Sequence, residues 1–164
     1  MDDMENQASD PAKGKTLKEK KDKAAITWVQ DYLSRRSHSE KELLEKLLKK
    51  EFDRDVALDA IALARERKWL ESPEELAEKV YTEWDKKNKS HAWITQYLDE
   101  KGLPSLDYDQ RREIEKATYH LRKKFGIINS ENHQRAGSNL ASKGFGYGEF
   151  KAAAENLKDE EEMK

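Results

Sequence analysis

Residues 26–48 of the chain read ITWVQDYLSRRSHSEKELLEKLL, and this stretch decides the fold class. Three apolar residues recur at helical spacing and lie on one face of a predicted helix: Ile26, Val29 and Leu33. Ser39 then stands three residues before Glu42, which is the capping-box pattern of a second helix start. An apolar stripe follows along that second helix: Leu43, Leu44, Leu47 and Leu48. Two helices joined by a tight turn are therefore predicted.

The same plan returns further along the chain. A third helix follows the first two, capped by Asp53 or Asp55, with an apolar face of Ala57, Ala60, Ile61 and Ala64. When the sequence is aligned with itself at a shift of 51 residues, Ser39 corresponds to Ser90. The apolar face of the first helix then corresponds to Ala77, Val80 and Trp84. Ile94 and Leu98 then continue the second-helix stripe, and Ile114, Ala117, Thr118 and Leu121 repeat the spacing of the third helix. A fixed period near 50 residues predicts an array of helical repeats.

A shift of 107 residues explains the glycine-rich stretch KGFGYGE at residues 143–149. Under this shift Leu33 becomes Leu140, so the stretch forms the turn between the first two helices of a third unit, with Gly144 at the helix end. A phosphate-binding loop would follow a strand or carry G-x-x-x-x-G-K-[ST], and neither is predicted here. We therefore interpret the stretch as a helix turn rather than a nucleotide site.

The predicted organisation has five segments. Residues 1–23 form a disordered or fraying charged tail, because they contain few large apolar side chains. Residues 24–72 form a first three-helix repeat, residues 73–128 a second and residues 129–157 a partial third. Residues 158–164 form an acidic tail. The predicted fold class is all-α, an elongated array of tandem three-helix repeats, two full and the third partly truncated.

The composition restricts the function. Charged residues make up 40% of the chain, and 32 basic residues face 34 acidic ones, so any binding to nucleic acid must come from a local face. There is no cysteine, which excludes disulfides and thiolate metal sites. No apolar run approaches the ~18 residues that a membrane span needs. We expect a soluble, cytoplasmic protein without membrane contact.

Catalytic and metal sites are not predicted. The four histidines, His38, His91, His120 and His133, show no spacing that would join several ligands to zinc. No nucleophile stands in a recognisable relation to a base. We therefore expect a protein that is not an enzyme and carries no metal or other cofactor. The four tryptophans are expected to pack the repeats, with an exposed partner anchor as the alternative reading.

Basic residues recur at equivalent positions of the repeats. Arg35 and Arg36 correspond to Lys86 and Lys87, and Arg36 also corresponds to Lys143. Such a row of positive charge suits a polyanionic track, whether DNA phosphate or an acidic protein face. A solvated surface explains the same pattern equally well.

Several motifs resemble those of the RecX proteins, bacterial regulators of the RecA recombinase. The run RSHSEKELLEKL, Arg36 to Leu47, is similar to the first-repeat signature of that family, and ITQYLDEKG at residues 94–102 to its second-repeat helix. KGFGY at residues 143–147 resembles the third-repeat R-G-F-S-Y, and KWLE at residues 68–71 stands where the family often has G-Y-L-D. The turn that is commonly K-G-Y-G reads KNKS here.

The resemblance implies a curved rod of three-helix repeats that binds RecA–DNA filaments and usually inhibits them, in DNA repair, recombination and the SOS response. Direct binding to single- or double-stranded DNA would be weak, and we expect a monomer. The alternatives are a general nucleic-acid-binding helical module and a scaffold for another protein. The candidate residues for partner or DNA binding are Arg35, Arg36, His38, Glu42, Lys46, Lys86, Lys87, Lys89, Arg111, Arg112, Arg122, Lys123, Lys124, Lys143 and Tyr147.

Overall fold

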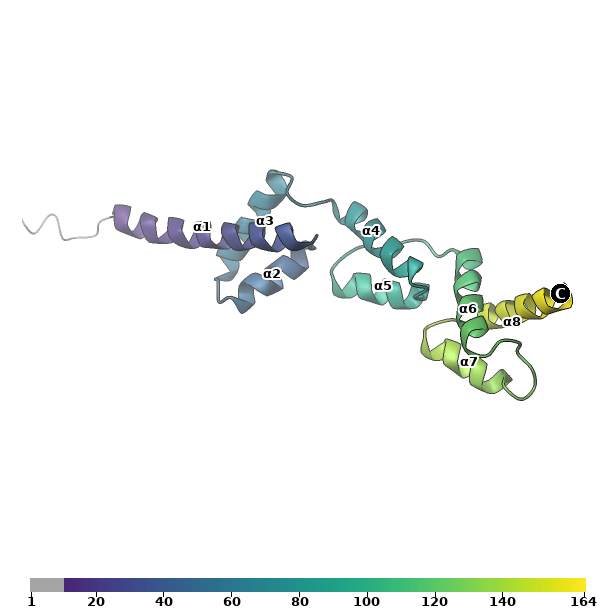
Figure 1. The fold of residues 1–164 in the computed structure, drawn as a ribbon. Coiled ribbons are helices and arrows are strands. Elements are labelled where there is room, and N and C mark those ends of the chain that lie inside the picture. Colours follow the sequence, from purple (N-terminus) through teal and green to yellow (C-terminus); the bar gives the residue numbers. More distant parts are fainter. Residues whose placement is uncertain (1–10) are drawn as a thin grey trace, which may run out of the picture. The chain divides into compact units, whose positions relative to one another are not determined.

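The computed structural model describes residues 11–164, which form eight helices and no strand (Figure 1). The helices are α1 (Pro11–Arg35), α2 (Glu40–Lys49), α3 (Arg54–Glu66), α4 (Pro73–Lys86), α5 (His91–Glu100), α6 (Gln110–Lys124), α7 (His133–Ser142) and α8 (Tyr147–Glu162). The predicted all-α class is confirmed over this range. Residues 1–10 of the predicted tail lie outside it, whereas residues 11–23, predicted to belong to that tail, form the start of α1.

The contacts divide the chain into two units, Met1–Ser72 and Pro73–Lys164. In the first unit, α1, α2 and α3 enclose one core, to which α1 contributes Ala25, Val29 and Tyr32. The predicted apolar faces supply the rest of this core: Leu43, Leu47, Ala57, Ala60, Ile61 and Ala64. The predicted stripe is wrong at Leu48, which is 39% exposed.

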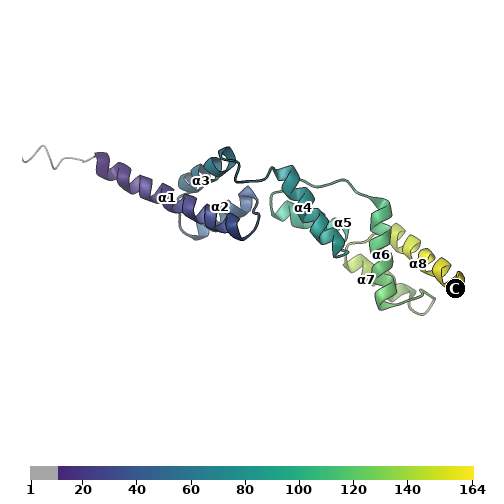
Figure 2. The ribbon, with the colours of Figure 1, turned by 45° about the horizontal axis from the view of Figure 1, so that its top comes forward.

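The second unit contains two separate cores. Helices α4 and α5 bury Leu76, Ala77, Ile94, Leu98 and Leu103, with Trp84 and Trp93 partly buried against them. Helices α6, α7 and α8 bury the other set: Ala117, Leu121, Ala136, Leu140, Phe145, Phe150, Ala153 and Leu157. The sequence assigns α6 to the second repeat, but its apolar side chains pack with α7 and α8, and α6 lies beside α8 (Figure 2).

Helix starts confirm the repeat register. Ser39, Ser90 and Gly146 are the N-caps of α2, α5 and α8, and they differ by the shifts of 51 and 107 residues. The Ser39 hydroxyl accepts from the Glu42 N–H and the Glu42 carboxylate accepts from the Ser39 N–H, so the predicted capping box is formed.

The glycine-rich stretch is a helix turn, as predicted. It joins α7 to α8, and Gly144 follows the C-cap of α7 with φ of +94°. A Cβ at this position would lie 2.5 Å from the Ser90 hydroxyl oxygen, so the chain can pass this close to α5 because residue 144 is glycine.

Candidate nucleic-acid interface

The turn of the first repeat is held together by its own signature residues. The Arg36 guanidinium donates to the Glu42 carboxylate at 2.7 Å. The His38 Nδ1–H donates to the Arg36 carbonyl at 3.0 Å, so its Nε2 is free to accept from the Lys46 ammonium at 2.7 Å. These side chains therefore lock the α1–α2 turn through contacts within the chain.

The charge state of His38 follows from this arrangement. Burial lowers the pKa of His38 below its usual value. The hydrogen bond to the Arg36 carbonyl raises this pKa, whereas the positive charges of Arg36 and Lys46 lower it. The net direction is downward, so the imidazole is neutral at pH 7, as its two hydrogen bonds require. Arg35, the remaining candidate of this turn, pairs with Asp31 at 3.0 Å.

In the second unit, a buried ionic cluster joins α4 to α6. The Asp85 carboxylate lies 2.9 Å from the Arg112 Nε and 3.0 Å from the Lys116 ammonium. The fully buried Lys116 also contacts Glu113 at 3.0 Å, and Glu113 accepts from the His91 N–H at the start of α5. Burial alone would raise the pKa of Asp85, but the hydrogen bonds from Arg112 and Lys116 outweigh it and hold that pKa below its usual value.

Two further hydrogen bonds connect the α4–α5 turn to the C-terminal helices. The His120 Nε2–H on α6 donates to the Asn88 carbonyl at 2.7 Å. The Ser90 hydroxyl donates to the Lys143 carbonyl at 2.6 Å, which places the α7–α8 turn against the start of α5. Together with the ionic cluster, these contacts bring together the basic ends of α4 and α6 and Lys143, the C-cap of α7.

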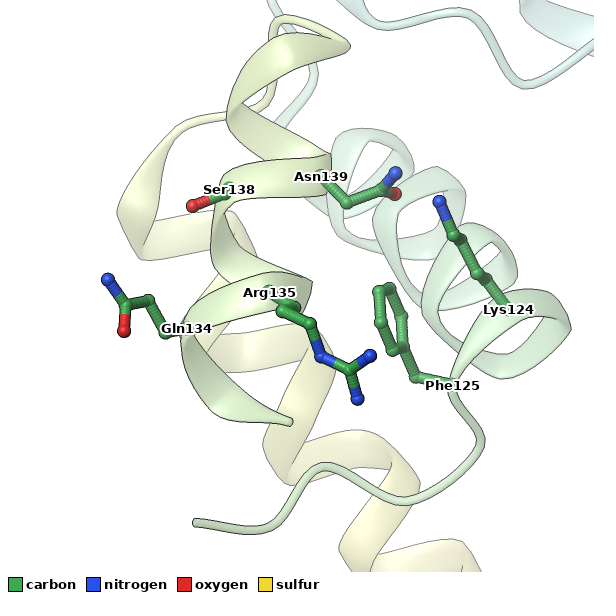
Figure 3. Close-up of a pocket in the computed structure, with 6 residues that line it drawn as sticks. All are labelled: Lys124, Phe125, Gln134, Arg135, Ser138 and Asn139. Atoms are coloured by element: carbon green, nitrogen blue, oxygen red, sulfur yellow. The ribbon is translucent and has the colours of Figure 1, made fainter. Parts of the chain in front are cut away.

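A pair of pockets lies where these helix ends meet. The first, of about 430 Å³, is lined by Lys87, Tyr119, His120, Lys123, Lys124, Asn139 and Lys143. The second, of about 520 Å³, is lined by Lys124, Phe125, Gln134, Arg135, Ser138 and Asn139 (Figure 3). Because the pockets share Lys124 and Asn139, we treat their linings as one surface, the basic groove.

The basic groove is strongly cationic. Five cationic side chains line it, and no carboxylate does so among the residues that the structure describes. Lys87 alone of these five has an ion pair within residues 11–164, with Glu83 at 3.6 Å one turn earlier on the exposed side of α4. Because exposed pairs contribute little, the positive charge of the groove is largely uncompensated.

The pKa of His120 reports the same field. Burial lowers this pKa, the hydrogen bond to the Asn88 carbonyl raises it, and the charges of Lys143, Lys89 and Lys123 lower it. A third pocket beside α6, of about 410 Å³, has Glu115, Asp159 and Glu160 in its lining together with Arg122. Unlike the basic groove, this pocket therefore has side chains of both charges in its lining, and Arg122 pairs with Glu160.

The structure brings together part of the predicted set. Lys87, Lys123, Lys124 and Lys143 line the groove, and Lys89 lies close enough to lower the pKa of His120. The other candidates of this unit lie outside the groove lining: Lys86, Arg111, Arg112, Arg122 and Tyr147. Arg112 belongs to the ionic cluster, and Arg122 pairs with Glu160 at 2.6 Å.

Sequence reasoning missed Tyr119, Phe125, Arg135 and Asn139 as groove residues, and it treated His120 only as a possible metal ligand. The sequence held a signal for Tyr119 and for His120, because both precede the basic run at 122–124 by one helical turn.

None of the helices within residues 11–164 is long and apolar enough to cross a membrane.

Comparisons with known proteins agree with this fold. Residues 25–62 match the family model described as RecX, first three-helix domain. The crystal structure of RecX from Lactobacillus salivarius has a TM-score of 0.71 and 18% identity, over 85% of this chain and 97% of that one. A crystal structure of regulatory protein RecX gives the same TM-score and identity, over 93% of this chain and 80% of that one. No curated protein gives a significant sequence match. Residues 25–62 are thus similar to the first three-helix domain of RecX, and the chain shares the fold of these two RecX structures.

Proposed function

We propose that this protein binds RecA–DNA filaments and lowers the recombinase activity of these filaments. The basic groove would contact the DNA backbone. The observation that carries the proposal is the cationic, carboxylate-free lining of the groove in a chain with two more acidic than basic residues. Lysine and arginine at such a surface neutralise phosphates and release their counterions.

Inhibition requires a difference in affinity between two states of the filament. A regulator lowers filament activity only if it binds the less active or shorter state more tightly. The groove can supply such a difference when the path of the DNA strand changes between states. Its cations are positioned by the ionic cluster and by the His120 and Ser90 hydrogen bonds rather than by long flexible loops.

Charge reversal in the groove tests this proposal. Lys123→Glu combined with Lys143→Glu should weaken binding to preformed filaments by about tenfold or more at moderate salt, because two phosphate contacts become repulsive. DNA-dependent ATP hydrolysis by the filament should then no longer fall when the variant is added. The matched control is Lys151→Glu with Lys158→Glu, since both are exposed lysines of α8 outside the groove lining.

The groove pair should lose binding while the control pair keeps it. Equal binding and equal inhibition by both pairs would contradict the proposal. A second candidate function, a general nucleic-acid-binding module, is favoured by the same groove. It predicts that bare DNA binds as tightly as the filament at physiological salt, and a direct competition between the two measures this.

A further inference from the structure

Two aromatic rings accompany the cations of the basic groove. Tyr119, on α6, lines the first pocket, and its side chain is 39% exposed rather than packed into the core of the helix bundle. Phe125, at the C-cap of α6, lines the second pocket and is half-buried. Six residues of helix separate them by about 9 Å along its axis, so one ring lies in each half of the groove.

The surroundings of these rings suit a stacked, negatively charged ligand. The Lys123 ammonium lies 5.7 Å from the centre of the Tyr119 ring, and the Lys124 ammonium lies 5.7 Å from that of Phe125. In Figure 3 the Phe125 ring lies between the side chains of Arg135 and Lys124. Alternation of rings and cations is the arrangement by which proteins bind single strands, with bases on the rings and phosphates on the cations.

An unused hydrogen-bonding atom lies at the junction of the two pockets. The Asn139 carboxamide lines both pockets and extends toward Lys124 (Figure 3). Its Oδ1 is buried and accepts no hydrogen bond within the part of the chain that the structure describes, so a ligand reaches this atom only after the carboxamide rotates into the groove. A buried acceptor without a partner is costly, and after such a rotation an amino or imino group of an unpaired base would donate to it.

We propose that the basic groove binds single-stranded nucleic acid, with phosphates on its lysines, bases stacked on Tyr119 and Phe125, and a base edge on Asn139. A duplex presents the phosphates but keeps its base faces stacked, so it leaves both rings and Asn139 without a ligand. The inference rests on the proposed function because it uses the same groove, and it adds that unpaired bases contribute to binding there.

The test compares three labelled probes of equal length by fluorescence anisotropy: oligothymidylate, an abasic strand and a duplex. Wild type should bind oligothymidylate about fivefold or more tightly than the abasic strand, since the two differ only in the bases. Tyr119→Leu should remove most of this difference and leave the affinity for the abasic strand and the salt dependence unchanged. Tyr119→Phe, which keeps the ring, should behave as wild type.

The matched control is Leu58→Ala, which shortens a 42% exposed apolar side chain of α3 outside the groove lining and should change nothing. Three outcomes would overturn the inference. They are equal affinity for thymidylate and abasic strands, a duplex bound as tightly as the single strand, and no measurable binding of oligothymidylate at low salt.

Failure of this inference can be told from failure of the proposed function. If Lys123→Glu with Lys143→Glu abolishes filament inhibition while wild type does not distinguish the probes, the groove acts on the filament through phosphates alone. If the probes are distinguished but the charge reversals leave filament inhibition intact, the groove is a single-strand site and the proposed function is wrong.

Discussion

Replacing Lys116 with methionine should strongly destabilise the second unit. The ammonium of this residue is fully buried between the carboxylates of Asp85 and Glu113, at 3.0 Å from each. Methionine preserves most of the length and packing of lysine, so the change isolates the charge. Without the ammonium, two carboxylates face each other in a region with little water.

The size of the effect follows from what remains. Removing one partner of a buried ion pair costs about 3–5 kcal/mol. Asp85 keeps its contact with Arg112, and 21% of its side chain is exposed, which relieves part of this cost. Glu113 is 4% exposed and keeps the bond from the His91 N–H. We therefore expect the lower end of the range, about 3 kcal/mol, which at an m-value of about 2 kcal/mol/M lowers the urea midpoint by about 1.5 M.

Urea unfolding followed by far-ultraviolet circular dichroism measures this loss. The control is Lys123→Met on the same helix, where an exposed lysine is lost and the change should stay within about 0.5 kcal/mol. Adding Glu113→Gln to Lys116→Met should recover part of the stability, because the unpaired buried charge is removed. If Lys116→Met costs no more than Lys123→Met, the ionic cluster does not hold α6 to α4.

Three further outcomes are expected. Gly144→Ala should cost about 1–3 kcal/mol because of its positive φ, whereas Gly148→Ala meets no atom within 4 Å and should stabilise α8 by about 0.5–1 kcal/mol; thermal melts compare the two. The pKa of His38 is lower in the folded state, so on acidification the unfolded chain takes up the proton first. The free energy of unfolding should therefore be highest above about pH 6.5 and fall as the pH drops below it. His38→Gln should make the melting temperature depend less on pH across this transition. A bound polyanion offsets the lysine charges that lower the pKa of His120, so binding raises that pKa. The affinity for DNA, measured by anisotropy, should therefore increase when the pH is lowered from about 7.5 to about 5.5. His120→Gln should not show this increase.

The repeat plan could be predicted because it depends on local signals. Apolar spacing and caps act over one or two turns, so Ser39, Ser90 and the turn at Gly144 take the predicted places. The partner of α6 could not be predicted in this way. Helical spacing identifies the apolar face of a helix but not which neighbouring helices cover it, and Ala117 and Leu121 pack with α7 and α8.

The candidate site was only partly predictable for a related reason. Charged residues on helices are usually exposed, so nothing distinguished the buried Lys116 from its neighbours except Glu113 three residues before it. Within the basic run, successive residues point about 100° apart around the helix. As a result Lys123 and Lys124 line the groove, whereas Arg122 turns to Glu160 on α8.

The joint between α4 and α6 has a consequence for motion in the second unit. The apolar clusters on its two sides are separate, and charged and polar contacts connect the helices across it. Separating α4 from α6 exposes charged groups that water can solvate, and it leaves both apolar cores intact. The free energy of this local opening is therefore lower than that of global unfolding, and the two halves behave as distinct cooperative units. Lys87 moves with one half and Lys123 with the other. The ionic cluster therefore sets the spacing of these cations, and a polyanion that binds both halves would stabilise the closed arrangement.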